Sequence, residues 1–134
     1  MAGNIRLEIV TPKKAVVDED AEIVMAPGAL GEFGVLIHHT PFMTTLKIGT
    51  LRFKDADGQE RYVFVSGGFA EVLPDRVTVL AESAERRRNI DPDRARSALD
   101  RAQQRLARED DDSVDIDRAQ AAIERALYRI KLAG

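Results

Sequence analysis

The hydrophobic period changes once along this chain, and that change limits the fold more than any other feature. Up to about residue 85, apolar side chains recur at every second position, as in Ile5–Ile9 and Arg76–Leu80. This is the period of a strand with one buried face. From Asp91 onward they recur at every third or fourth position, as on one face of a helix. The sequence therefore predicts a β-rich part followed by a helical part.

Turn-forming residues divide the first part into short strands. Thr11-Pro12, Pro27-Gly28, Gly67-Gly68 and Pro74-Asp75 interrupt the alternation. Such interruptions at roughly 8–12-residue spacing are typical of an all-β domain. We expect an antiparallel sandwich or barrel, with a tight bend between strands at Gly67-Gly68.

The second part contains two helices of matched pattern. Asp91 suits an N-cap and Pro92 suits the first helical position. Acid-Arg-Ala triplets a heptad apart occur in both helices, at 93–95 and 100–102 and again at 117–119 and 124–126. The polar, acidic stretch 108–114 is short enough to join antiparallel helices. We expect a hairpin whose alanine-rich face buries little area, at roughly 25 cal/mol per Å², and which can therefore detach.

Composition excludes several classes of function. The chain has no Cys, so disulfides, thiolate metal sites and Cys nucleophiles are excluded. Its net charge of −3 comes from interspersed acids and bases, so a nucleic-acid-binding surface is not indicated. Without Trp, the core must be mainly aliphatic. No apolar run has the length of a membrane span or of a signal-peptide core, which favours a soluble, cytoplasmic protein.

Candidate catalytic groups are few. Neighbouring His38 and His39 would point to opposite faces of a strand, so they are poorly placed to share one metal. The Ser66-Gly67-Gly68 stretch lacks the lysine and the following helix of a phosphate loop. Spacing alone leaves a triad of Ser66, His39 and a carboxylate open, although no nucleophile-elbow motif supports it.

The helical arginines form two similar stripes. Their spacings of seven and four residues put like charges at i,i+4, which costs a few tenths of a kcal/mol in an isolated helix. One interpretation is a solvated face beside the packing face. The other is that guanidinium groups converge in the folded hairpin and bind an anion, either a phosphate or a partner's carboxylates. The stripes are Arg94, Arg101 and Arg105, followed by Arg118, Arg125 and Arg129.

Three motifs in order resemble a known family. They are Gly31–Leu36 followed by His39–Pro41, then Phe64–Val72, and finally Ile90–Ala95. Along essentially its full length the chain resembles the epsilon subunit of the bacterial F-type rotary ATP synthase. The resemblance implies a mainly β plus α fold: an N-terminal antiparallel β-sandwich of about ten strands in residues 1–85, then an antiparallel two-helix hairpin in 86–134.

The resemblance also implies a function without catalysis and without a required cofactor. Family members sit on the central stalk at the cytoplasmic face of the inner membrane and touch the membrane only through the complex. The sandwich binds the gamma subunit and the c-ring, helping to couple proton or sodium flow to ATP synthesis. The folded hairpin permits turnover, whereas the extended hairpin reaches the alpha and beta subunits and inhibits ATP hydrolysis.

Positions that match family sites follow from the same resemblance. Some members bind ATP as a regulatory ligand through an Ile/Leu-Asp-x-x-Arg-Ala motif and nearby charges. The candidate rotor and c-ring contacts are Glu32, His39, Ser66, Gly67 and Gly68. The candidate nucleotide-binding residues are Glu85, Ile90, Asp91, Arg94, Ala95, Arg101, Arg125 and Arg129.

The chain departs from the family in one loop, and two other functions remain open. Ile37-His38-His39 stands where the family usually has Pro-Gly-His. A β-sandwich enzyme with a helical lid would show itself by turnover of a nucleotide or an ester. An adaptor whose helices bind an unrelated partner would fail to co-purify with the gamma subunit.

Overall fold

The chain divides into two compact units, one ending at Arg87 and one beginning at Arg88. The computed structural model describes residues 3–108 and 114–134. The units are described in turn.

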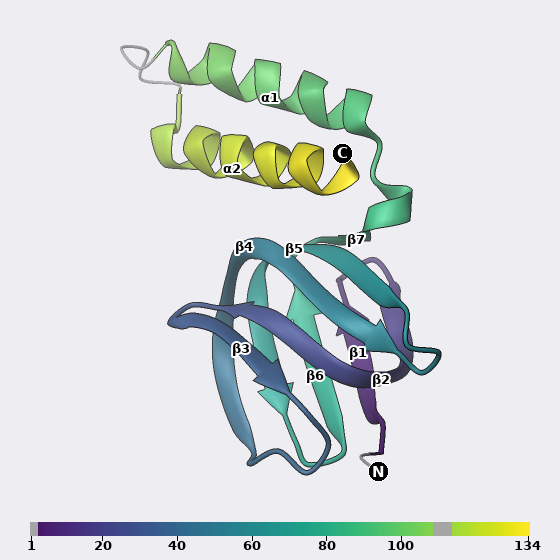
Figure 1. Ribbon diagram of the computed structural model, residues 1–134. Coiled ribbons are helices and arrows are strands. Elements are labelled where there is room, and N and C mark those ends of the chain that lie inside the picture. The colour runs from purple at the N-terminus through teal and green to yellow at the C-terminus, as the bar shows by residue number, and fades with distance from the viewer. Residues whose placement is uncertain (1–2, 109–113) are drawn as a thin grey trace. The chain divides into compact units, whose positions relative to one another are not determined.

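In the described residues of the first unit, seven strands form one sheet that closes on itself. The sheet order is β1-β6-β5-β4-β2-β3, an additional β1–β2 pairing closes the ring, and β7 pairs with β5. The result is a barrel-like β-sandwich (Figure 1). The strands are β1 (Ile5–Val10), β2 (Ala15–Gly28), β3 (Gly31–Val35), β4 (Phe42–Asp55), β5 (Glu60–Val72), β6 (Arg76–Ala81) and β7 (Ala84–Arg86).

The strands are fewer and longer than the sequence predicts. In place of about ten, the described residues form seven, because β2 and β4 each run for 14 residues and β5 for 13. Gly67-Gly68 lies within β5, so this pair does not separate two strands, whereas Pro27-Gly28 ends β2 just before the turn to β3. The sheet is also not purely antiparallel, because β1 pairs with β6 in parallel.

Gly67 and Gly68 bend β5 instead of ending it. Their φ angles are 73° and 118°, values that side-chain-bearing residues rarely adopt. A Cβ atom on Gly68 would overlap the backbone oxygen of Leu80 on the neighbouring strand. Glycine therefore lets one strand change direction while it stays paired with β4 on both sides of the bend.

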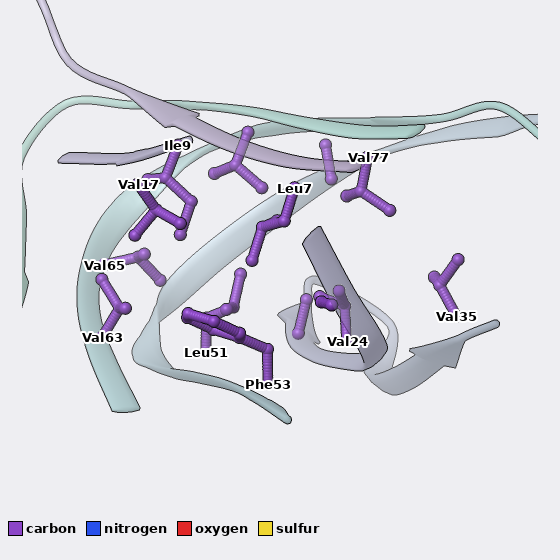
Figure 2. Packing of buried hydrophobic residues seen from close by; sticks show 14 of the residues in the cluster. Leu7, Ile9, Val17, Val24, Val35, Leu51, Phe53, Val63, Val65 and Val77 are labelled. Carbon is purple, nitrogen blue, oxygen red and sulfur yellow. The ribbon is translucent and has the colours of Figure 1, made fainter. Parts of the chain in front are cut away.

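The core of this unit is aliphatic, as the composition predicts. Alternate side chains of β1 are fully buried, and so are facing residues of β2, β4 and β5. Figure 2 shows Phe53 among branched aliphatic side chains. Those labelled there are Leu7, Ile9, Val17, Val24, Val35, Leu51, Val63, Val65 and Val77.

A buried carboxylate organises the turn between β4 and β5. Asp55 accepts hydrogen bonds from the backbone N–H groups of Gln59 (2.9 Å) and Asp57 (3.0 Å) and from Nε of Arg61 (3.0 Å). The bond from Gln59 contributes most to lowering the Asp55 pKa. Arg61 and Asp57 lower it further, against the opposing effect of burial.

The second unit is a two-helix hairpin. A short 3₁₀ helix, η1 (Arg87–Asn89), leads into α1 (Pro92–Leu106), and α2 (Ile116–Ala133) follows. The two helices lie side by side and run in opposite directions, as the sequence predicts (Figure 1). The buried helical residues are alanines at heptad spacing, namely Ala95 and Ala102 on α1 and Ala119 and Ala126 on α2.

Each helix begins with an aspartate cap. Asp91 has extended backbone angles, and its side chain accepts from the N–H groups of Asp93 (3.0 Å) and Arg94 (3.1 Å). Asp115 accepts from the N–H of Arg118 (3.0 Å) in the same way. These bonds satisfy backbone donors that have no partner within the helix, so the predicted start of α1 is confirmed.

Within residues 3–108 and 114–134, no helix has both the length and the hydropathy needed to cross a membrane. The same residues contain no group of three or more His, Asp or Glu side chains able to hold a metal ion.

Candidate functional site

An apolar hollow of about 390 Å³ lies at the β2–β3 turn and the start of β4. Leu30 stands fully exposed in the turn, and the Met43 side chain is 68% exposed. Exposed apolar side chains that gather around a hollow mark a surface that binds a partner. The lining residues are Leu30, Gly31, Glu32, Phe33, Phe42, Met43 and Thr44.

Two of the predicted rotor contacts belong to this hollow or adjoin it. Glu32 lines it and forms an exposed ion pair with Arg52, 3.3 Å between Oε1 and the guanidinium. The His39 ring lies 5.3 Å from the ring of Phe42, which in turn packs edge-on against Phe33 at 5.1 Å. The fold thus brings Glu32 and His39 to the same apolar surface from separate parts of the sequence.

The loop that departs from the family pattern makes a sharp turn just before this hollow. His38 adopts φ 68°, in the left-handed region, and its N–H donates to the carbonyl of Pro74 at 2.6 Å. The N–H of His39 donates to the carbonyl of Leu36 at 3.2 Å, and its Nδ1 lies 2.7 Å from the carbonyl of Thr40. Histidine therefore occupies a position where the backbone conformation favours glycine.

The other three predicted rotor contacts lie apart from the lining of the hollow. Ser66 is buried, and its N–H donates to the carbonyl of Ser83 at 2.9 Å. Gly67 and Gly68 are the bend in β5. The requirements of the β5 strand and its bend explain why these three residues are present. Their contact with a rotor partner stays a prediction.

The nucleotide-binding candidates gather mainly at one end of the hairpin. Asp91, Arg94 and Ala95 occupy the start of α1, and Ile90 precedes them. Because the helices are antiparallel, the C-terminal turns of α2 reach the same end (Figure 1). Those turns carry Arg129, whereas Arg125 lies near the middle of α2.

These candidates differ in how accessible they are to a ligand. Arg94 and Arg101 are exposed, and Arg125 is half-buried. Ile90 and Ala95 are buried, and one oxygen of Asp91 is occupied by the helix cap. Glu85 belongs to the first unit, where it is paired with Phe64 across β7 and β5.

Leu30 and Met43 are the functional candidates that the motifs do not indicate. The signal available in the sequence was an apolar residue inside a turn, Leu30 between Ala29 and Gly31, where water exposure normally selects polar residues. In the sequence, Met43 is one residue of an alternating strand pattern. Only the pairing of β4 shows that the face of the strand carrying Met43 is exposed.

Two family models match the chain in order. The β-sandwich domain of the ATP synthase delta/epsilon chain matches residues 4–87, and the long α-helix domain of the same chain matches residues 88–134.

Individual relatives agree with this match. The ATP synthase epsilon chain of Desulfatibacillum aliphaticivorans is 68% identical over 106 residues, covering 79% of this chain and 75% of the relative. That of Desulfosudis oleivorans is 63% identical over 106 residues, covering 79% and 80%. A chain in the cryo-EM structure of the Euglena gracilis mitochondrial ATP synthase, OSCP/F1/c-ring in rotational state 1, has a similar fold. Its TM-score is 0.77 at 24% identity, covering 92% of this chain and 78% of that one.

Since both domain models match in order and relatives of high identity span most of the sequence, this chain belongs to the family of bacterial ATP synthase epsilon chains.

Proposed function

We propose that this chain is a central-stalk subunit of a proton- or sodium-translocating ATP synthase and couples ion flow to ATP synthesis. Epsilon chains are non-catalytic, so the function lies in binding and in conformational state. The observation that carries the proposal is the exposed apolar hollow beside Glu32 and His39, in a chain of this family.

The hollow supports contact with the c-ring, and the sandwich as a whole is proposed to bind the gamma subunit. A fully exposed leucine gains free energy only when a partner covers it. Glu32, which lines the hollow, and its ion-pair partner Arg52 supply charged groups that would fix the orientation of the bound partner. The chain would then sit at the cytoplasmic face of the inner membrane, held there through the complex.

Replacement of Leu30 by Asp tests this contact directly. Leu30 is fully exposed, so the variant keeps the fold while placing a charge where the partner would cover an apolar side chain. We expect affinity for the detergent-solubilised c-ring to fall roughly tenfold or more. Leu80→Asp is the matched control, because Leu80 is 56% exposed but does not line the hollow. Equal c-ring binding by wild type and Leu30→Asp would refute the contact.

The hairpin is proposed to regulate the complex. In the folded state it permits turnover, and in an extended state it contacts the alpha and beta subunits and inhibits ATP hydrolysis. ATP bound to the folded hairpin would favour the permissive state by differential binding. What supports this is that Arg94, in the aspartate-capped start of α1, and Arg129, in the last two turns of α2, belong to the same end of the hairpin.

Calorimetric titration of MgATP into the purified chain tests the nucleotide site. We expect saturable binding that is lost in Arg101→Ala/Arg125→Ala. Arg96→Ala is the control, because Arg96 is exposed and pairs with Asp93 on the same helix (2.9 Å). Absence of binding heat at millimolar ATP would refute the nucleotide site, and the arginines would then be expected to bind the carboxylates of a partner protein.

Asp91 needs a separate variant because it already caps α1. Asp91→Ser keeps a side-chain oxygen for the cap but removes the carboxylate. Weaker ATP binding with unchanged helix content would assign the carboxylate a role in binding the ligand. Unchanged ATP binding would restrict Asp91 to the cap.

A further inference from the structure

Strand β3 has a free edge. In the part of the chain that the structure describes, it pairs only with β2, from Val24–Val35 to Gly28–Gly31, and no strand lies on its other side (Figure 1). A strand edge of this kind presents unpaired backbone groups, on which a strand of another chain can add. The edge of β3 is therefore a surface suited to main-chain pairing.

The ladder with β2 shows which backbone groups of β3 face the free side. A two-residue turn closes on Gly28 and Gly31, which makes these two residues a hydrogen-bonded pair. In an antiparallel ladder such pairs alternate with pairs that exchange no bonds, and Pro27, which has no N–H, accordingly faces Glu32. The N–H and C=O groups of Glu32 and Gly34 therefore point away from β2. Among the described residues, none of these backbone groups has a hydrogen-bond partner.

The sequence of β3 fits a second copy of itself in antiparallel register. When Phe33 faces its own equivalent, Glu32 of each copy faces Gly34 of the other, and each of these pairs can exchange both N–H···O bonds. Gly31 faces Val35 in the same register. Every larger side chain apart from the central phenylalanine thus lies opposite a glycine, which leaves room for it. One strand therefore supplies both halves of a two-fold symmetric contact.

Exposed leucines stand at both ends of the strand, at equal distances from its centre. Leu30 is fully exposed and Leu36 is 50% exposed. They lie three residues before and three residues after Phe33. The register that pairs the two strands therefore brings Leu30 of one copy to Leu36 of the other, at each end of the contact. Burial of these apolar side chains would favour the pairing.

The charge of Glu32 does not oppose this register. Glu32 faces a glycine of the second copy, so like charges are not directly opposite each other. Its carboxylate also has an ion-pair partner within its own chain, the guanidinium of Arg52 at 3.3 Å. Each copy thus brings a locally balanced pair of charges to the contact.

We infer that β3 pairs with β3 of a second copy, so that the chain forms a symmetric dimer when it is outside the complex. Gly31, Glu32 and Phe33 also line the apolar hollow, so the second copy would occupy the surface that is proposed to receive the c-ring. The dimer and the assembled state would therefore exclude each other. Self-pairing would cover the exposed strand edge until assembly.

Sedimentation equilibrium of the full chain, at about 10–500 µM, tests the inference. We expect a reversible monomer–dimer equilibrium, which is weak because one pair of short strands buries a small area. Leu36→Asp should weaken the dimer about tenfold or more, since it places a charge against Leu30 of the second copy. Leu80→Asp is the matched control, because Leu80 is 56% exposed and lies on β6. Circular dichroism checks that both variants fold.

Amide hydrogen exchange, followed by NMR at low and high chain concentration, shows which strand pairs. Exchange at the N–H groups of Glu32 and Gly34 should slow in proportion to the dimer fraction, whereas those of Gly31, Phe33 and Val35 stay protected at both concentrations. A chain that remains monomeric at the highest concentration overturns the inference and leaves the edge to a strand of a different protein. A dimer in which Glu32 and Gly34 exchange as fast as in the monomer overturns it as well. Neither measurement uses the c-ring, so the result is independent of the contact proposed above.

Discussion

At the scale of single residues, His38 stands out because its side chain is poorly suited to its backbone. A φ of 68° brings Cβ close to the following carbonyl, at a cost of about 1–2 kcal/mol for residues other than glycine. The turn is nevertheless held by the bond from His38 N–H to the Pro74 carbonyl. A position whose backbone conformation favours glycine is thus occupied by histidine at the expense of stability.

His38→Gly should therefore stabilise the first unit. Relief of the strain outweighs the extra freedom that glycine gives the unfolded chain, and we expect a net gain of about 0.5 kcal/mol. Urea unfolding followed by circular dichroism measures it. His39→Gly is the contrasting variant, since it removes the ring that packs on Phe42 and should destabilise. If His38→Gly also destabilises, the strain argument is wrong.

Asp55 gives the first unit a defined response to acid. Its pKa is lowered in the folded chain, chiefly by the hydrogen bond from Gln59. The stability it contributes is present above its unfolded pKa of about 3.9 and is lost as the pH falls through the lower folded value. Asp55→Asn should thus lower the Tm by a few degrees at pH 7, and the gap to wild type should narrow below about pH 4.

Thermal scans at pH values from 7 to 3 measure the difference in Tm between Asp55→Asn and wild type. Asp57→Asn serves as the control, because the side chain of Asp57 is exposed and only its backbone N–H bonds to Asp55. A Tm difference that stays constant over this pH range would show that the charge of Asp55 does not contribute to the stability of the first unit.

At the scale of elements, the hairpin depends on small side chains at its buried positions. Ala126 is 1% exposed, so a larger residue there has to push neighbouring groups apart. Ala126→Leu should destabilise the hairpin by about 1–3 kcal/mol and accelerate hydrogen exchange in α1 and α2. Gln120→Leu adds the same side chain at an exposed position and should leave exchange unchanged. Equal exchange in both variants would contradict close packing at Ala126.

The sequence predicted the helices better than the strands, for a local reason. Helix signals such as the cap at Asp91 and the heptad alanines lie within a few residues of one another, and both helices start where those signals stand. The Gly67-Gly68 pair is ambiguous, because the same glycines permit either a chain reversal or a bend. Only the pairing of β5 with β4 on both sides of the two glycines decides between a reversal and a bend.

At the scale of the whole molecule, the sequence names only some of the residues that the candidate surfaces contain. Local motifs name Glu32, His39 and the residues around Asp91 as candidates, and their roles stay predictions. Leu30 and Met43 were not named, because their exposure beside the hollow depends on neighbours that are distant in the sequence. The candidate surfaces combine side chains from separate elements, and periodicity alone does not show which of them meet.

The long strands give the first unit mechanical continuity. β4 and β5 pair from Phe42–Val72 at one end to Lys54–Glu60 at the other, and both run unbroken through that ladder. A load applied to residues near the hollow at the start of β4 would travel along covalent backbone and its hydrogen bonds, without having to cross a boundary between short strands joined by turns. The paired β4 and β5 strands would therefore resist twisting together, and not one short segment at a time.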